Sequence, residues 1–279
     1  MHKLTIRRLP IYVCVGLFLG LWLFVSLVPF YLSVITSLKS NRDWGLNSVF
    51  AFPERLMFEN YLRVIGDGIL INFRNSLIVV SIALAALLVI SLCAAYPLSR
   101  LRFKLNRPIF LFIVASMAIP MHVTLIPIYL LTLRMGIFDT FWALILPYIA
   151  FNIPITVFIL TNFMKSIPRE IEEAAEIDGC SKMRVFVNII TPLSSAGVVT
   201  VAIFNAVAMW NEFSFALVLM QTRSLLTLPL AVWNYRAQYH MDVPLIFVVV
   251  IFSVVPMIIA YAIGQDKLVK GMIAGAIKG

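Results

Sequence analysis

Six long apolar stretches, separated by shorter polar segments, set the pattern of this chain. Each has about 20 residues or more, the length that a helix needs to cross the hydrocarbon core of a bilayer. None shows the strict alternation of a half-buried strand, and a helix satisfies its backbone hydrogen bonds within one segment. We therefore expect an all-α, polytopic membrane protein with one transmembrane domain over residues 1–279 and six spans at 11–36, 76–97, 108–131, 140–164, 193–220 and 243–264.

Prolines interrupt two of the predicted spans. Pro120 and Pro127 lie in the third, and Pro147 and Pro154 lie in the fourth. A proline removes a backbone donor, and the freed carbonyls need partners from neighbouring helices or water. We expect kinks in both spans. Kinks of this kind suit a bundle that moves, but many membrane helices tolerate them and they identify no site.

Composition agrees with a membrane protein. The chain is 62% hydrophobic and 13% charged, whereas soluble proteins carry about 25% charged residues. The net charge of +9 does not indicate nucleic-acid binding, because the basic residues lie at the ends of apolar segments rather than on one stripe. The three cysteines and three histidines show neither a disulfide framework nor the spacing of metal ligands. We expect no metal or cofactor on this chain.

The distribution of basic residues predicts the orientation. With the N-terminus in the cytoplasm, fourteen of the 22 Lys and Arg residues fall on the cytoplasmic side and eight on the external side. Cytoplasmic loops carry the excess of Lys and Arg, so both termini and the polar segment 166–192 are expected in the cytoplasm. The first apolar run lacks a small-residue cleavage site, and we expect it to be retained as a span.

The polar segment 166–192 carries five of the chain's thirteen acidic residues. Pro168 near its start and Gly179 as a stop predict a short helix, with Ser166 as the N-cap. This helix would stand between two spans, exposed on the cytoplasmic side. Such a position is typical of a docking element.

A second short helix is expected after the glycine, capped by Ser181 and closed by Pro192. On the first helix, Glu172 and Glu176 lie away from a narrow face of mostly small residues. That face would let another surface approach closely. It is formed by Ile171, Ala174, Ala175 and Asp178.

Several positions in this segment resemble the EAA loop of permease subunits of binding-protein-dependent ABC importers. The matching residues are Glu173, Ala174, Ala175, Gly179, Ile189 and Pro192, while Thr191 stands where the pattern has Leu. In that family the loop forms the coupling helix that fits a cleft on the cytoplasmic ATPase subunit. The resemblance implies the same role here. The alternative is a solvated amphipathic loop, because charge-rich loops are common.

The predicted fifth span contains an acidic residue well inside the membrane. Glu212 follows Trp210 and Asn211, and intramembrane ionisable groups usually face the bundle interior or a water-filled cavity. The run from Trp210 to Phe213 resembles the carbohydrate branch of the same permeases. Asn and Glu side chains can hydrogen-bond sugar hydroxyls, so these residues are expected to line a translocation path. A structural polar clamp between helices is the alternative.

The segment 265–279 also resembles this family, in which the equivalent tail projects between the two ATPase subunits. The resemblance implies an ATPase contact, and a frayed chain end is the alternative. The Leu-Pro-Leu-Ala run at 228–231 resembles the family's external loop that reaches toward the solute-binding protein, although an aromatic belt explains the rings beside it. The tail positions that match are Gln265, Leu268, Val269, Gly271, Ala274, Gly275, Lys278 and Gly279.

No phosphate-binding loop of the form G-x-x-x-x-G-K-[ST] occurs, so we expect no catalytic site on this chain. The resemblance implies a permease subunit of a carbohydrate ABC importer, a multi-pass protein of a bacterial-type cytoplasmic membrane. Its partners would be a second, different permease subunit, two ATPase subunits that bind ATP and Mg, and an extracytoplasmic solute-binding protein. Alternatives are a permease for a polyol phosphate or another small solute and, less favoured, an ion-coupled secondary transporter that uses Glu212.

Overall fold

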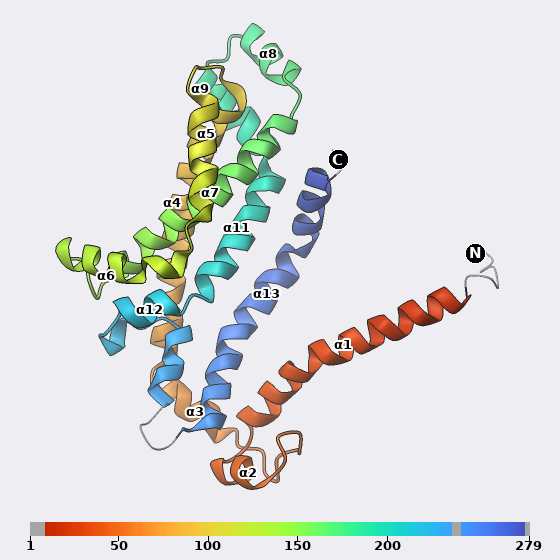
Figure 1. Ribbon diagram of the computed structural model, residues 1–279. Coiled ribbons are helices and arrows are strands. Elements are labelled where there is room, and N and C mark those ends of the chain that lie inside the picture. Colours follow the sequence, from red (N-terminus) through yellow and green to blue (C-terminus); the bar gives the residue numbers. More distant parts are fainter. Residues whose placement is uncertain (1–8, 236–240, 277–279) are drawn as a thin grey trace. The chain divides into compact units, whose positions relative to one another are not determined.

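The computed structural model describes residues 9–235 and 241–276, with side chains described from 11 to 262 outside that gap (Figure 1). The regular elements within these ranges are all helical, which confirms the all-α fold. The α-helices are α1 (Leu9–Ser37), α2 (Asn41–Leu46), α3 (Glu59–Gly66), α4 (Ile69–Arg100), α5 (Asn106–Ala115), α6 (Leu125–Arg134), α7 (Phe141–Ser166), α8 (Glu170–Ile177), α9 (Lys182–Val185), α10 (Thr191–Leu193), α11 (Ser195–Trp210), α12 (Ser214–Leu219) and α13 (Val243–Ala276). Short 3-10 segments are η2 (Ser116–Ala118), η3 (Met121–Thr124), η5 (Arg223–Leu225) and η6 (Pro229–Tyr235), and η4 (Phe186–Ile190) is a π-helical turn.

Four described helices are long and apolar enough to cross a membrane alone. They lie in α1, α4, α7 and α13, and α4 is the longest continuous candidate of the four with 32 residues. Two further candidates are bent helix pairs, and counting each pair as one span gives six. The predicted number of spans is therefore consistent with the structure, although two of them are not straight.

The third predicted span is broken rather than kinked. The helix ends at Ala118, Ile119 is extended with ψ 112°, and the chain turns by 84° before it continues from Met121 to Arg134. Pro120 explains the position of the break, because a proline disfavours helical geometry in the residue before it. The same reasoning does not transfer to α7, which remains one helix through Pro147 and Pro154.

The fifth predicted span also differs from expectation. Its helix is bent by 70° between Lys182–Leu193 and Ser195–Trp210, and it stops at Trp210. A new helix, α12, begins only at Ser214. The prediction of one continuous span over 193–220 was wrong, because apolar composition alone does not reveal a break at Asn211.

The chain divides into two compact units. Unit 1 contains Met1–Ile69 and Val232–Val254, and unit 2 contains Leu70–Ala231 and Val255–Gly279. In unit 1 the buried Lys39 donates to the carbonyls of Ser48 (3.0 Å) and Val49 (3.2 Å), which closes the turn around α2. The single transmembrane domain stays a prediction.

Unit 2 is held together around α7, which α5 and α11 both contact (Figure 1). Gly197 on α11 lets the helices approach closely, since a Cβ there would lie 2.8 Å from Phe163 Cγ. Such small residues are typical of helix contacts within membranes. Closer to the C-terminal end of α11, on the same interface, Asn205 Nδ2 donates to Thr156 Oγ1 at 3.0 Å. These contacts hold α7 and α11 together, and the polar segment 166–192 connects these two helices.

Candidate functional site

The segment 166–192 folds as a helix, a glycine bend and a second helix, as predicted. Acidic residues in the first turn of α8 favour its N-terminus through the helix dipole. At the other end Gly179 has φ +82° and its N–H bonds to the Glu176 carbonyl, while Cys180 N–H bonds to the Ala175 carbonyl, both at 3.0 Å. This pair of bonds is the Schellman motif, which requires a left-handed residue and therefore favours glycine.

Two details of the prediction for this segment were wrong. Ser166 is the last residue of α7 and donates to the Phe163 carbonyl at 2.8 Å, so it does not cap α8, which begins after Arg169 without a side-chain cap. Ser181 does cap the second helix, since its Oγ accepts from Arg184 N–H at 3.4 Å. Pro192 does not close that helix.

The helix after Ser181 runs on past Pro192 because its geometry changes before the proline. The π-helical turn η4 separates α9 from α10, and the chain continues helically to Leu193. A proline lacks an N–H and its ring crowds the carbonyl four residues earlier, here that of Asn188. The wider π turn, which contains Asn188, accommodates both effects.

The segment 166–192, called the docking segment below, packs against the rest of unit 2 through one side of its helices. Ala175, Val185 and Ile190 are buried in a cluster that also contains Leu160 and Met164 of α7. Of the predicted small-residue face, only Ala175 is buried within this chain, whereas Ile171, Ala174 and Asp178 are exposed. The rest of this face is open to another surface, and its contact with an ATPase stays a prediction.

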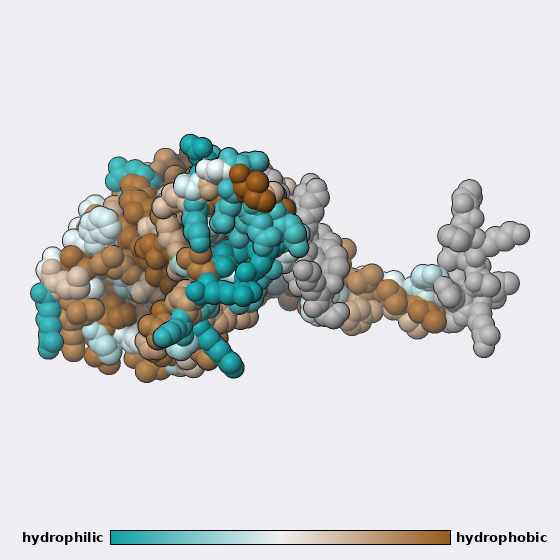
Figure 2. Space-filling model, turned by 90° about the horizontal axis from the view of Figure 1, so that it is seen from above, coloured by the Kyte–Doolittle hydropathy of each residue, from teal (hydrophilic) through white to brown (hydrophobic). Residues whose placement is uncertain are grey.

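Two exposed apolar residues accompany the exposed acidic ones, and sequence reasoning did not select them. Ile177 at the end of α8 is 85% exposed and Met183 on α9 is 69% exposed. Seen from the α8 end, Figure 2 shows hydrophilic side chains gathered over this part of the molecule with apolar atoms among them. An apolar residue two positions before the helix-ending Gly179 was the available signal. A mixed surface of this kind is typical of a protein interface.

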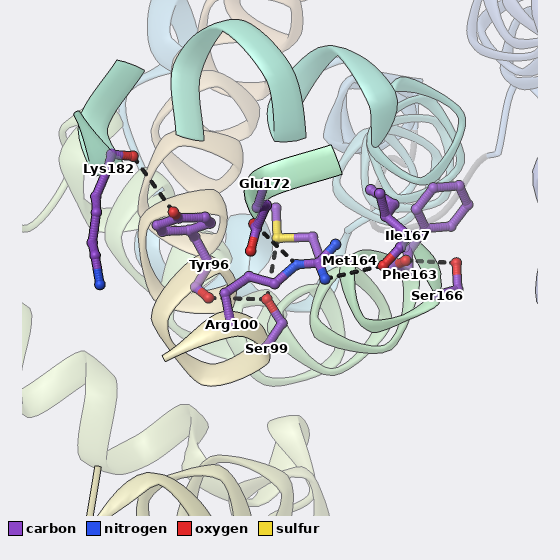
Figure 3. A network of polar contacts seen from close by, with 9 residues as sticks. All are labelled: Tyr96, Ser99, Arg100, Phe163, Met164, Ser166, Ile167, Glu172 and Lys182. Atoms are coloured by element: carbon purple, nitrogen blue, oxygen red, sulfur yellow. Dashed lines mark hydrogen bonds and ion pairs between the residues drawn. The ribbon is translucent and has the colours of Figure 1, made fainter. Parts of the chain in front are cut away.

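Arg100, the last residue of α4, connects that helix to the docking segment (Figure 3). Its side chain is 2% exposed, its Nη1 donates to the Ile167 carbonyl at 3.0 Å, and its Nε lies 3.3 Å from Glu172 Oε1. A charge this deeply buried needs a partner of opposite sign. Sequence reasoning counted Arg100 among the fourteen basic residues on the predicted cytoplasmic side but did not pair it with Glu172.

A second contact joins α4 to the other half of the segment. The rings of Tyr96 and Phe186 lie 4.8 Å apart between centroids. Tyr96 Oη also donates to the Lys182 carbonyl at 3.4 Å (Figure 3). The final turn and a half of α4 therefore touches both helices of the segment. Movement of α8 and α9 would be transmitted directly to α4.

The residues predicted to line a translocation path have mainly structural contacts. Glu212 accepts from Tyr148 Oη at 2.8 Å and from the N–H of Phe215 at 2.7 Å, so it caps α12 and clamps it to α7. Trp210 is buried and packs edge-on against Phe73, with 5.6 Å between ring centroids. Asn211 is exposed. These contacts favour the polar clamp for Glu212, and the role of the three residues in a path stays a prediction.

A cavity of about 550 Å³ lies where the third predicted span breaks. It is lined from the break by Met117 and Pro120, from α7 by Asn152 and Pro154, and from α11 by Phe204. Sequence reasoning noted both prolines but assigned no site to them. Two prolines at similar depth in adjacent spans were the signal.

At the end of unit 2 away from α8, polar side chains fasten the loop that contains 228–231. Asn72 and Asn75 donate to the Leu226 carbonyl at 2.9 and 3.0 Å, and Ser76 Oγ accepts from Leu228 N–H at 2.8 Å. Their side chains are almost fully buried. The segment predicted to face the solute-binding protein is therefore held rigidly on the first turns of α4.

The predicted tail continues α13 as a helix to Ala276. Side chains beyond residue 262 are outside the described part of the structure, and Lys278 and Gly279 lie outside the described residues altogether. The contacts of the tail with an ATPase therefore stay a prediction.

Comparison with known proteins gives consistent matches over most of the chain. The profile of a family described as "binding-protein-dependent transport system inner membrane component" matches residues 86–274. The putative ABC transporter permease protein ORF2 of Caldicellulosiruptor sp. is 44% identical over 94% of this chain and 96% of its own length. The melibiose/raffinose/stachyose import permease protein MelC of Bacillus subtilis is 30% identical, with 90% and 91% covered.

A solved structure shares the fold. One chain of a bacterial ABC transporter involved in the import of the acidic polysaccharide alginate superposes with a TM-score of 0.81, covering 95% of this chain and 99% of its own. The two sequences are 20% identical, so the likeness concerns the fold alone.

Proposed function

The chain belongs to the family of binding-protein-dependent transport system inner membrane components, and from this membership we propose that it is one of two permease subunits of an ATP-driven carbohydrate importer. As a member of this family it is a multi-pass permease of the cytoplasmic membrane rather than an enzyme. The observation that carries the proposal is the docking segment 166–192, whose two helices expose one surface and are fastened to α4 by the other.

The proposed partners follow from the chain's chemistry and its family. Two ATPase subunits would bind ATP and Mg, because this sequence has no phosphate-binding loop. A second, different permease subunit would complete the pathway, and an extracytoplasmic binding protein would deliver the solute. No cofactor is assigned to this chain. We propose that Glu173, Ala174 and Ile177 belong to the surface presented to the ATPase, since all three are exposed on or beside α8.

The proposed coupling step is mechanical. Closure of the ATPase subunits would displace α8, and the contacts of Arg100 with Glu172 and Ile167 would carry the displacement to the end of α4. The bundle would then exchange between inward and outward access. Such an exchange requires two arrangements that the partners stabilise to different extents.

The proposed solute is a di- or oligosaccharide, because a relative of similar length is named for melibiose, raffinose and stachyose. We assign the cavity at the break of the third span to the pathway, because its lining includes the polar side chains of Ser116 and Asn152. A polyol phosphate or another small solute is the second candidate.

An ion-coupled secondary transporter is less well supported. That class would need a titratable group free to exchange an ion, and Glu212 is the carboxylate that such a mechanism would use. Its oxygens instead accept hydrogen bonds from Tyr148 and from two N–H groups at the start of α12. These partners support a fixed structural role for Glu212.

Uptake of labelled raffinose into proteoliposomes tests the proposal. The full chain is reconstituted with its partner permease, ATPase subunits and binding protein, with ATP enclosed on the ATPase side. Uptake should require all four components and ATP hydrolysis. Uptake driven by an ion gradient without the ATPase would refute the assignment, whereas ATP-dependent uptake of a different solute would revise only the substrate.

A further inference from the structure

A cavity of about 560 Å³ with a strongly basic wall lies between the α4–α5 connection and the end of α7. It is separate from the docking surface of α8 and from the cavity at the span break. The proposed function uses none of its charged residues. Five basic side chains line it: Arg102, Lys104, Arg107, Lys165 and Arg169.

No acidic residue is among the described residues that line this cavity, whereas five basic ones are. Among the described side chains, those of residues 11–235 and 241–262, the ion pairs are Arg55 with Glu59, Arg63 with Asp242 and Arg100 with Glu172, and none of these involves the five basic residues. Five cations around one cavity repel one another, and an anion bound among them would relieve that repulsion. The chemistry of the wall therefore selects an anion.

The cavity wall is preorganised rather than a loose surface loop. Asn106 Nδ2 donates to the carbonyls of Leu101 at 2.9 Å and Leu98 at 3.2 Å, which closes the connection between α4 and α5 into a tight turn. Lys165 is placed by Phe110, with its Nζ 5.0 Å from the ring centroid. The cations on both sides of the cavity are thus carried by ordered backbone, which lowers the entropic cost of binding.

The surroundings of the cavity indicate which kind of anion fits. The lining includes the apolar side chains of Leu101 and Phe103. Beyond Arg107, α5 presents exposed apolar side chains, with Leu111 53% and Phe112 77% exposed. A charged headgroup in the cavity could therefore continue into acyl chains along α5. A free phosphate would use the cations but leave this apolar surface unoccupied.

We propose that the cavity binds the headgroup of an anionic phospholipid, with the phosphate among the Arg and Lys side chains and the acyl chains along the exposed face of α5. Basic pockets between membrane helices bind such headgroups, and each nearby Lys or Arg contributes favourably. Arg169 is the N-cap residue of α8, so the lipid would touch the docking segment directly before that helix. Lipid binding itself does not depend on the proposed transport function.

Native mass spectrometry of the purified full chain with its partner subunits tests the proposal. The complex is exchanged into mixed micelles with equal amounts of phosphatidylglycerol and phosphatidylcholine, and the retained lipids are counted. The wild type should retain phosphatidylglycerol preferentially. In the double variant Arg102→Gln/Arg107→Gln, the ratio of retained phosphatidylglycerol to phosphatidylcholine should fall about fivefold for each cation removed.

A matched control removes two charges at the same end of unit 2 but outside the cavity. Lys182→Gln/Arg184→Gln should keep the wild-type preference, and Arg102→Lys/Arg107→Lys should keep most of it while reporting on folding. Equal losses in the cavity variant and the control, or no loss in either, would overturn the proposal. Displacement of phosphatidylglycerol by inorganic phosphate at about 10 mM would also overturn the proposal. The charge of the phosphate group would then account for binding without the acyl chains, as expected of a site for a soluble anion.

Discussion

Arg100 Nε at the end of α4 lies 3.3 Å from Glu172 Oε1 in the first turn of α8, with the two side chains only 2% and 15% exposed. The pair joins a membrane-length helix to the proposed coupling helix without a well-aligned hydrogen bond between the two groups. The Ile167 carbonyl holds the guanidinium from the other side. Such a pair is held by charge and packing, so its contribution to coupling is testable by changing charge alone.

Replacing either partner should impair coupling because it leaves the other charge buried. Breaking a buried ion pair by removing one partner costs about 3–5 kcal/mol. We expect Arg100→Gln and Glu172→Gln each to lower solute transported per ATP hydrolysed, and the double variant to recover part of that ratio. The measurement is a double-mutant cycle in proteoliposomes. Additive losses, with no recovery in the double variant, would show that the two residues act separately.

Adding a methyl group at Gly197 should loosen the contact between α11 and α7. The new Cβ would lie 2.8 Å from Phe163 Cγ and 3.2 Å from its Cβ, closer than atoms tolerate. Overpacking of this kind costs about 1–3 kcal/mol. We expect Gly197→Ala to lower the thermal unfolding midpoint and Phe163→Ala to restore part of it. A variant as stable as the wild type would contradict the close approach of the two helices.

Asp139 should make stability depend on pH at the end of unit 2 opposite α8. Partial burial alone would raise its pKa, but hydrogen bonds from Thr222 Oγ1 and from the N–H groups of Gln221 and Thr222 outweigh burial and lower the pKa. Because the folded pKa is below the unfolded value, this stabilisation is present above the unfolded pKa and is lost as pH falls through the folded one.

Comparison of wild type with Asp139→Asn checks the pH effect. Asparagine tolerates the left-handed backbone of this position, φ +56°, and does not titrate. The unfolding midpoint of the wild type should exceed that of the variant at pH 7, and the difference should shrink below about pH 4, where unfolded aspartate is protonated. A difference that is constant from pH 3 to pH 7 would count against the argument.

Substitutions of Glu212 distinguish a structural carboxylate from an ion-coupling site. Glu212→Gln keeps an acceptor for the Phe215 N–H at the start of α12, and its amide NH2 can donate to Tyr148 Oη, so ATP-driven uptake should continue. Glu212→Ala removes the cap of α12 and should cost about 0.5–2 kcal/mol of stability. Loss of uptake in Glu212→Gln with unchanged stability would favour an ion-coupled mechanism.

The sequence predicts those parts of the structure that depend on local pattern. Apolar length located the spans, and the position of Gly179 predicted the helix stop and bend, which the structure forms with a left-handed residue. The pattern could not reveal the pairing of Arg100 with Glu172, since one basic residue near a span end is explained equally well by orientation. Prolines were also ambiguous: Pro120 ends a helix, while Pro154 remains within one, because the outcome depends on packing.

The helix α8 is the proposed coupling helix, and Gly179 offers the sharpest test of that role. Its φ of +82° strains most residues with a Cβ, and no atom lies within 4 Å of a Cβ placed there, so within this chain a substitution acts through the backbone bend. Gly179→Val should cost at least about 1–2 kcal/mol of local strain, whereas Gly179→Asn tolerates this conformation.

The decisive measurement is the ratio of solute imported to ATP hydrolysed by the reconstituted complex, compared among the wild type, Gly179→Asn and Gly179→Val. We predict that the asparagine variant keeps the wild-type ratio and that the valine variant, inserted and assembled normally, loses most of it. An unchanged ratio in Gly179→Val would contradict the role of α8 in coupling.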